Sequence, residues 1–142
     1  MDKKPFVTLE QLREIERTYP TPFYLYDEKG IRENAARLKQ AFSWNRGYKE
    51  YFAVKATPNP FLLNITEDMG CGTDCSSMTE LMMSRACGFS GSDIMFSSND
   101  TPPEEFAYAE KLGAIINLDD ITHIQCLEET LGHNSGDHQL PF

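Results

Sequence analysis

Four short strand-like segments recur at a nearly constant spacing, and this period constrains the fold more than any other feature of the chain. The segments begin near residues 51, 72, 94 and 115, so consecutive starts lie 21 or 22 residues apart. Each interval has room for one helix. Strands and helices that alternate in this way are typical of parallel βα units.

Each interval also opens with residues that favour the start of a helix. N-cap residues are followed by a proline at the first helical position or by a glutamate three residues later. The helix-start signals of the four intervals are, in order, Asn59 with Pro60, the capping box Ser77–Glu80, the capping box Thr101–Glu104, and Asp119 or Asp120. The pattern predicts four helices that end near residues 69, 87, 112 and 131.

Two architectures use repeated βα units, the doubly wound sheet and the (β/α)8 barrel. A doubly wound nucleotide-binding sheet carries a glycine-rich turn after its first strand. The corresponding turn here is Thr57-Pro-Asn-Pro60, which has no glycine. The even period therefore predicts an α/β fold of the barrel type. A full barrel takes about 250 residues, so we expect a partial (β/α)8 TIM barrel of about four βα units.

The chain divides into three predicted parts. Residues 47–132 form the partial barrel, and residues 1–46 form an N-terminal lead-in of strand and helix. In the lead-in, apolar spacing predicts helices over residues 8–19 and 28–42. The aromatic run Phe23–Asp27 between them has high strand propensity. Residues 133–142 form a polar tail.

Composition excludes several classes of function. The net charge is −9, so the chain repels phosphate backbones and is not expected to bind nucleic acid. It has no apolar stretch long enough to span a membrane. The N-terminus lacks the hydrophobic region of a secretory signal, which predicts a cytoplasmic location. The four cysteines lack zinc-site spacing, so we expect reduced thiols and no metal site.

Lys55 is the strongest catalytic candidate. Strand alternation places Tyr51, Ala53 and Lys55 on one face of the first segment. A lysine is unfavourable beneath the helices, so Lys55 should point into the barrel at the carboxyl end of the strand, where barrel enzymes keep catalytic groups. A buried lysine amine suits Schiff-base chemistry, and the small Ala53 leaves room for a planar ring. The alternative is a strand-end lysine that reaches solvent.

Asp74 lies on the second segment among mostly small residues. A carboxylate within a strand should be paired, because an unpaired buried charge is costly, and Lys55 on the neighbouring strand is a candidate partner. The alternative is a loop or capping aspartate. Glu80 is explained by the capping box that it forms with Ser77.

Four blocks together carry a resemblance to a known family. In order and spacing they resemble the fold-type III pyridoxal-phosphate enzymes, the alanine racemase-like barrels that include the basic amino-acid decarboxylases. Within this family the chain is most similar to the diaminopimelate decarboxylases, over roughly residues 20–131. The blocks are Tyr51-Phe-Ala-Val-Lys-Ala56, Gly72-Thr-Asp-Cys-Ser-Ser-Met-Thr-Glu-Leu81, Asp93-Ile-Met-Phe-Ser-Ser-Asn-Asp100 and Ala114-Ile-Ile-Asn-Leu-Asp119.

The resemblance implies a cofactor, a reaction and roles for the candidate residues. Lys55 would hold pyridoxal 5'-phosphate as a Schiff base and move a proton at the product carbon. Ala53 would line the face of the cofactor ring, and Asp74 would lie beside Lys55 and the cofactor. Glu80 matches a family carboxylate near the active site. The small-molecule amino-acid substrate would be meso-2,6-diaminoheptanedioate, which the family converts to L-lysine and CO2.

The resemblance also implies that parts of the family machinery lie outside this sequence. They include the glycine-rich phosphate loops, the acidic residue beside the pyridine nitrogen, and a second β-rich domain that family homodimers use to complete their sites. We therefore expect a truncated form with little activity alone. Residues 133–142 do not resemble the family, whereas a shifted reading frame of their back-translated codons resembles its next strand. We interpret the tail as the product of a frameshift or a premature stop.

Two alternative functions stay open. One is a related decarboxylase that acts on carboxynorspermidine, ornithine or arginine, because the substrate-side residues are not in this sequence. The other is a catalytically dead regulatory or binding paralogue that pairs with a full-length enzyme.

Overall fold

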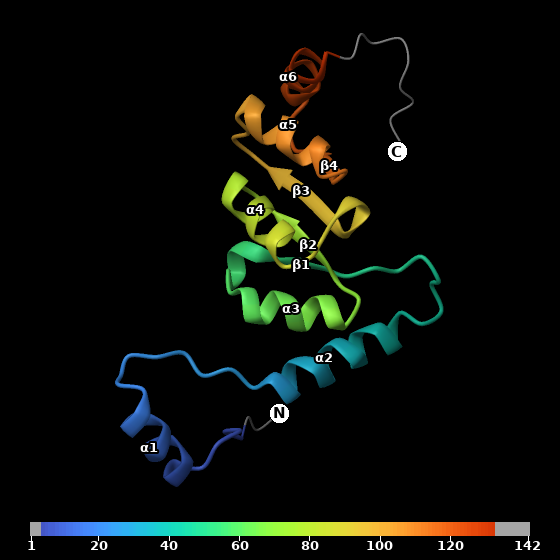
Figure 1. The fold of residues 1–142 in the computed structure, drawn as a ribbon. Coiled ribbons are helices and arrows are strands. Elements are labelled where there is room, and N and C mark those ends of the chain that lie inside the picture. The colour runs from blue at the N-terminus through green and yellow to red at the C-terminus, as the bar shows by residue number, and fades with distance from the viewer. Residues whose placement is uncertain (1–3, 133–142) are drawn as a thin grey trace.

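The computed structural model describes residues 4–132, and these form a stack of βα units with two preceding helices (Figure 1). The strands are β1 (Tyr51–Ala53), β2 (Gly72–Cys75), β3 (Ile94–Ser98) and β4 (Ile115–Leu118). The helices are α1 (Leu9–Thr18), α2 (Glu28–Ala41), α3 (Pro60–Asp68), α4 (Met78–Ala86), α5 (Pro103–Lys111) and α6 (Thr122–Leu131). Short 3-10 turns cover Val54–Ala56 and Gly91–Asp93.

The four strands form one parallel sheet in the order β1-β2-β3-β4. Helix α3 follows β1, α4 follows β2, α5 follows β3 and α6 follows β4. The sequence period is therefore confirmed as four parallel βα units, the arrangement of half a (β/α)8 barrel.

Side-chain alternation gives the sheet two different faces. On one face Cys75, Ile94 and Phe96 are fully buried beneath the helices, which contribute Leu63 and Phe106 to the same core. The opposite face carries side chains that are only half-buried or exposed. In a closed barrel the corresponding face is the interior, so this sheet exposes the side that a complete barrel encloses.

Local capping explains why the helices begin where they do. The side chain of Asn59 accepts a hydrogen bond from the Phe61 amide at 3.0 Å, and Pro60 is the first helical residue of α3, as predicted. Ser77 caps α4 by accepting from the Glu80 amide. These caps satisfy amides that the first helical turn leaves free. The cap predicted at Asp119 or Asp120 is wrong, because the N-cap of α6 is Ile121, although Asp120 accepts a hydrogen bond from the Thr122 amide.

The capping box predicted at Thr101–Glu104 is wrong. Helix α5 has Pro102 as its N-cap, and Thr101 instead donates its hydroxyl to the carbonyl of Ser98 at 3.1 Å. A proline has no amide proton and prefers the dihedral angles of the first turn. The helix therefore starts at Pro103, one residue later than a Thr101 cap requires.

Two strand predictions also need correction. The run Phe23–Asp27 forms no strand, because it has no neighbouring strand to pair with, and Tyr24 is 89% exposed. The segment predicted as a strand over Tyr51–Ala56 pairs with β2 only as far as Ala53. Beyond Ala53 the chain forms the 3-10 turn Val54–Ala56, and residues 57–59 then connect this turn to α3.

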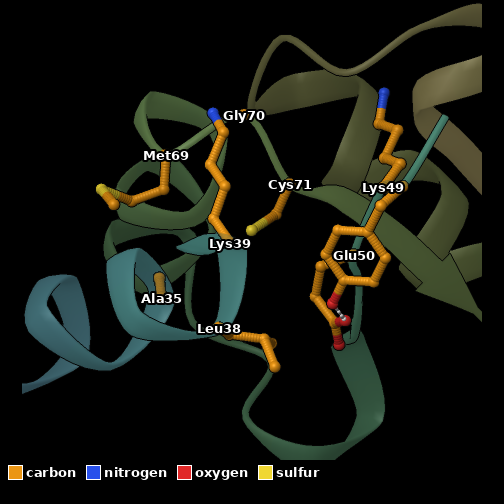
Figure 2. Close-up of a pocket in the computed structure, with 9 residues that line it drawn as sticks. Ala35, Leu38, Lys39, Lys49, Glu50, Met69, Gly70 and Cys71 are labelled. Carbon is orange, nitrogen blue, oxygen red and sulfur yellow. Dashed lines mark hydrogen bonds between the residues drawn. The ribbon is translucent and has the colours of Figure 1, made fainter. Parts of the chain in front are cut away.

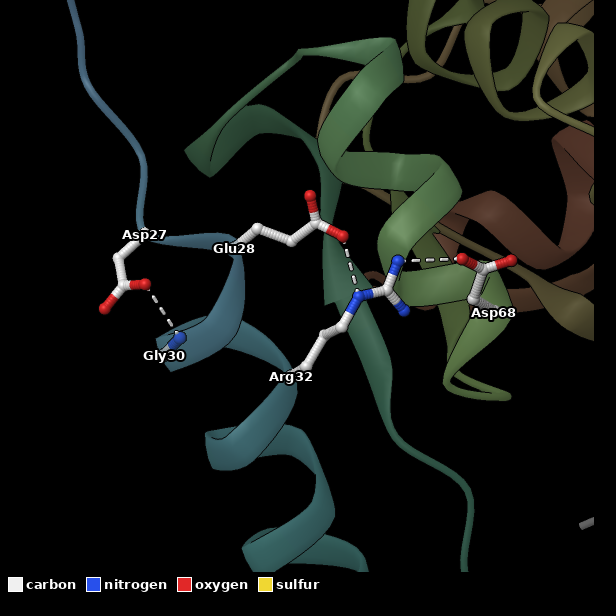
Figure 3. Close-up of polar contacts among 5 residues, drawn as sticks. All are labelled: Asp27, Glu28, Gly30, Arg32 and Asp68. Atoms are coloured by element: carbon white, nitrogen blue, oxygen red, sulfur yellow. Dashed lines mark hydrogen bonds and ion pairs between the residues drawn. The ribbon is translucent and has the colours of Figure 1, made fainter.

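Helix α2 is joined to the barrel units by an arginine that reaches two helices. Figure 3 shows Arg32 between Glu28, one turn earlier on α2, and Asp68 at the end of α3. The two nitrogen–oxygen distances are 2.8 and 2.9 Å. Asp27 caps the same helix by accepting from the Gly30 amide. The contact fixes α2 beside α3, at the β1 end of the stack.

None of the helices in the described part of the chain combines the length and hydrophobicity that crossing a membrane requires. The tail of residues 133–142, and with it the frameshift hypothesis, lies outside the described residues. The boundary at residues 46 and 47 remains a prediction.

Candidate functional site

Lys55 lies directly beyond the carboxyl end of β1, in the 3-10 turn Val54–Ala56. The turn is closed by the Thr57 amide, which donates to the Val54 carbonyl at 3.1 Å. Val54 is fully buried in the core, whereas Lys55 is exposed. Because the valine anchors the turn on the helix side, the lysine is presented at the mouth of the sheet rather than within it.

Ala53 and Asp74 are direct neighbours on the open face. They are paired residues in the parallel register of β1 and β2, and Asp74 is paired in turn with Met95 on β3. Residues in register on neighbouring strands point to the same side of a sheet. The structure thus pairs Asp74 with Ala53, whereas the partner expected from the sequence was Lys55, which lies two residues after Ala53 in the turn that follows β1.

Asp74 is a half-buried carboxylate whose hydrogen bonds are incomplete. Its Oδ1 atom is buried and has no hydrogen-bond partner among the described residues. Burial raises the pKa of Asp74 above its ordinary value, the charge of Lys55 opposes that rise, and the charge of Glu80 adds to it. Within the described residues Lys55 and Asp74 do not form a contact ion pair. Their interaction is one of charge through space.

Glu80 turns toward the loop that follows β2. Its carboxylate accepts a hydrogen bond from the Ser76 amide at 2.8 Å. A standard capping box would instead use the amide of the N-cap, Ser77. The predicted box is therefore present in its first half only, and the carboxylate of Glu80 remains close enough to act on Asp74.

Further along the open face the structure adds polar residues that the sequence interpretation missed. Asn117 on β4 donates its side-chain amide to the Ser97 hydroxyl on β3 at 2.9 Å. Ser97 alternates with the buried Phe96 and Ser98, and Asn117 with the partly buried Ile116 and Leu118, so strand alternation was the signal that could have found them. They extend the polar surface away from Lys55 and Asp74.

A separate hollow lies at the opposite end of the strands (Figure 2). It sits between α2 and the segments that precede β1 and β2, and has a volume of about 60 Å³. Burial raises the pKa of the Cys71 thiol on its wall. The hollow is well below the roughly 300–1,000 Å³ of typical ligand sites, which is too little for a ring-sized cofactor.

Comparison with known proteins places this site in a family. The family model for the pyridoxal binding domain of pyridoxal-dependent decarboxylases matches residues 28–137. This range includes every strand of the sheet and the residues of the open face. The chain belongs to the pyridoxal-dependent decarboxylases. The cofactor of this family is pyridoxal phosphate, and the fold is that of its N-terminal barrel domain.

Two relatives show how much of a longer protein this chain covers. Protein TabA of Pseudomonas amygdali pv. tabaci is 43% identical over 109 residues, which are 77% of this chain and 26% of the relative. The diaminopimelate decarboxylase of Methanothermobacter thermautotrophicus is 33% identical over 117 residues, or 82% of this chain and 27% of the relative. This chain therefore spans about a quarter of the length of these relatives.

A solved structure gives the same result. The crystal structure of diaminopimelate decarboxylase from Helicobacter pylori complexed with L-lysine superposes with a TM-score of 0.76 and 28% identity. The match covers 85% of this chain and 31% of that one. The four βα units thus correspond to the early part of a much larger decarboxylase fold.

Proposed function

We propose that this chain is the lysine-bearing, cofactor-binding part of a decarboxylase that converts meso-2,6-diaminoheptanedioate to L-lysine and CO2. The observation that carries the proposal is the placement of Ala53 and Asp74 in register on the open face, with Lys55 in the turn that follows β1. The diaminopimelate decarboxylases among its relatives and structural neighbours support this substrate.

The residues present fit pyridoxal phosphate. The buried Oδ1 of Asp74 lacks a partner, which is the state expected of a polar atom that awaits a bound group. Ala53 beside it has the smallest side chain that a strand offers apart from glycine, so a planar ring meets little obstruction there. Lys55 supplies an exposed amine at the same mouth. These three residues would hold the cofactor.

Each residue has a distinct task in this proposal. Lys55 would bind the cofactor covalently through its amine and later deliver a proton to the carbon that has lost its carboxylate. Asp74 would hold the charge of that amine in place. Ala53 would support the ring. When bound, pyridoxal phosphate supplies an electron sink for the carbanion that remains after CO2 leaves.

We expect the whole decarboxylase to be a cytoplasmic homodimer, and the 142-residue chain on its own to have little activity. The described residues supply four strands, whereas a complete barrel has eight. The phosphate group and the substrate need further groups that this part of the chain does not contribute.

Covalent labelling tests the proposal directly. The purified chain is mixed with pyridoxal phosphate, reduced with borohydride and digested, and the modified lysine is identified by mass spectrometry. We expect the label on Lys55, and its loss in Lys55→Ala. Lys39→Ala is the matched control, because Lys39 is an exposed lysine at the other end of the sheet. Label distributed equally over the surface lysines would contradict the proposal.

Substrate identity needs the complete decarboxylase. Release of CO2 from meso-2,6-diaminoheptanedioate, compared with ornithine and arginine at equal concentration, measures the preference. We expect turnover of the first compound to dominate. Preferential turnover of ornithine or arginine would assign the site to a related decarboxylase instead.

A further inference from the structure

The loop between β2 and α4 is held by two carboxylates that come from different helices. Glu80 of α4 accepts from the Ser76 amide at 2.8 Å. Glu105 of α5 accepts from the Met78 amide at 2.9 Å, across 27 positions of sequence. With Ser77 capping the Glu80 amide, three donors at the start of α4 are occupied by side chains of the protein itself.

The reach of Glu105 has a local cause. Glu105 is the third residue of α5, the position from which a glutamate normally bonds back to the amide of its own N-cap. That N-cap is Pro102, which has no amide proton. The carboxylate is therefore left without its usual donor, and it lies half-buried against the start of α4, where Met78 offers one.

We infer that Glu105 is a positioning residue, which locks the β2–α4 loop to the next βα unit and thereby fixes Glu80 beside Asp74. The inference rests on the proposed function in so far as Asp74 serves the cofactor. Asp74 is the second-last residue of β2, and the loop begins directly after the strand. The loop is thus the structural link between the two carboxylates.

Release of this lock has a defined consequence for Asp74. Without the bond from Met78, the first turn of α4 loosens, and the Glu80 carboxylate can leave the Ser76 amide and turn to water. Burial and the charge of Glu80 are the two influences that raise the pKa of Asp74. Both weaken when the loop opens, so the pKa of Asp74 falls toward its ordinary value.

The same contacts close the N-terminus of α4 to external anions. A free helix N-terminus binds phosphate through its unpaired amides. Here the amides of Ser76, Met78 and Glu80 already donate to side chains. Two of the acceptors are carboxylates, which repel a phosphate.

Hydrogen exchange and a carboxyl titration test the inference on the full 142-residue chain. In Glu105→Ala we expect the Met78 amide to exchange about five to ten times faster, as the loss of one hydrogen bond predicts. Carbon-13 NMR of Asp74 should show a lower pKa. Glu105→Gln retains an acceptor oxygen, so it should preserve both values. Glu104→Ala, in the same turn but exposed, is the matched control.

A second variant removes the donor rather than the acceptor. Met78→Pro places a proline at the first position of α4, where helices accept it, and should reproduce the lower pKa of Asp74 even if Glu105→Ala fails to fold. An unchanged Asp74 titration in both variants would overturn the inference. Labelling of Lys55 by pyridoxal phosphate is measured separately, so failure of the proposed function and failure of the positioning role give different results.

Discussion

Ala53 on β1 and Asp74 on β2 lie side by side in register, on the side of the sheet that the helices leave open. The pairing puts a half-buried carboxylate beside the smallest side chain of the row. Since Oδ1 of Asp74 has no hydrogen-bond partner in the described part of the chain, the ionised form is unfavourable there, and Asp74 is one residue through which pH should act on the isolated chain.

Asp74→Asn should stabilise the chain at neutral pH. Burial raises the pKa of Asp74 above its ordinary value of 3.8, so between the unfolded and the folded pKa the folded state binds more protons. Stability is therefore lost as the pH rises through this window. Asparagine carries no charge and removes that loss. We expect the free energy of unfolding at neutral pH to rise by about 0.5–1 kcal/mol, once solvent screening of the partly exposed group is allowed for.

Chemical denaturation of both proteins between pH 3 and pH 8 measures the effect. The gain from Asp74→Asn should shrink as the pH falls below the ordinary carboxyl value, where Asp74 is protonated in both states. A gain that stays constant across the range would show that the charge of Asp74 is not its cause.

Phe106→Ala should be among the most destabilising single changes in this sheet and helix stack. Phe106 is 1% exposed and packs edge-on against Phe96, with ring centroids 6.1 Å apart, and against His123 on α6. Deletion of a buried phenylalanine costs about 3–5 kcal/mol. Phe61→Ala is the matched control because that ring is 80% exposed, and urea denaturation should leave its midpoint nearly unchanged. Equal losses of stability in Phe106→Ala and Phe61→Ala would show that Phe106 is not part of the core.

The sequence predicted what is encoded locally and missed what depends on distant partners. Asn59 and Pro60 begin α3 as expected, because a cap and a first-turn proline act within one helical turn. The length of β1 was overestimated, since its end is decided by where pairing with β2 stops, at Ala53. Phe23–Asp27 has strand propensity without a strand to pair with.

In the candidate site, too, local features were predicted and contacts between distant residues were not. Alternation within one strand was enough to place Ala53 on the open face, and the residue pattern singled out Lys55 and Asp74, whose roles came from the family resemblance. Alternation did not predict that Lys55 would lie in a turn beyond the strand, because pairing with β2 stops at Ala53. Local sequence could not predict that Glu105 would reach Met78, because the contact joins two βα units. The one local clue was Pro102, whose missing amide leaves the glutamate without its usual donor.

Gly72→Ala should destabilise the sheet at the amino end of β2. A Cβ atom at Gly72 would lie 2.6 Å from the ring of Tyr51 and 2.6 Å from the backbone oxygen of Asp93. Both approaches are shorter than normal contacts, and the backbone oxygen cannot turn aside as a side chain can. We expect a loss of about 1–3 kcal/mol, typical of overpacking.

A double mutant separates the two clashes at Gly72. In the background Tyr51→Ala the ring is gone but the Asp93 oxygen remains, so thermal or urea denaturation should show a reduced penalty for Gly72→Ala rather than none. An identical penalty in both backgrounds would mean that the ring of Tyr51 does not limit the space at this position.

Ile115→Lys should reduce self-association of the 142-residue chain. Ile115 lies on β4, an edge strand of the described sheet, and on its open face, with 41% of its surface exposed. An edge strand offers unpaired backbone groups to another chain, and an outward lysine opposes such pairing. Sedimentation velocity over a range of concentrations should show a smaller weight-average mass for the variant. Ile121→Lys is the matched control, because Ile121 is 82% exposed but lies outside the strand. If both lysines lower the mass equally, the added charge acts through general solubility, and the edge of β4 is not the surface through which the chains meet.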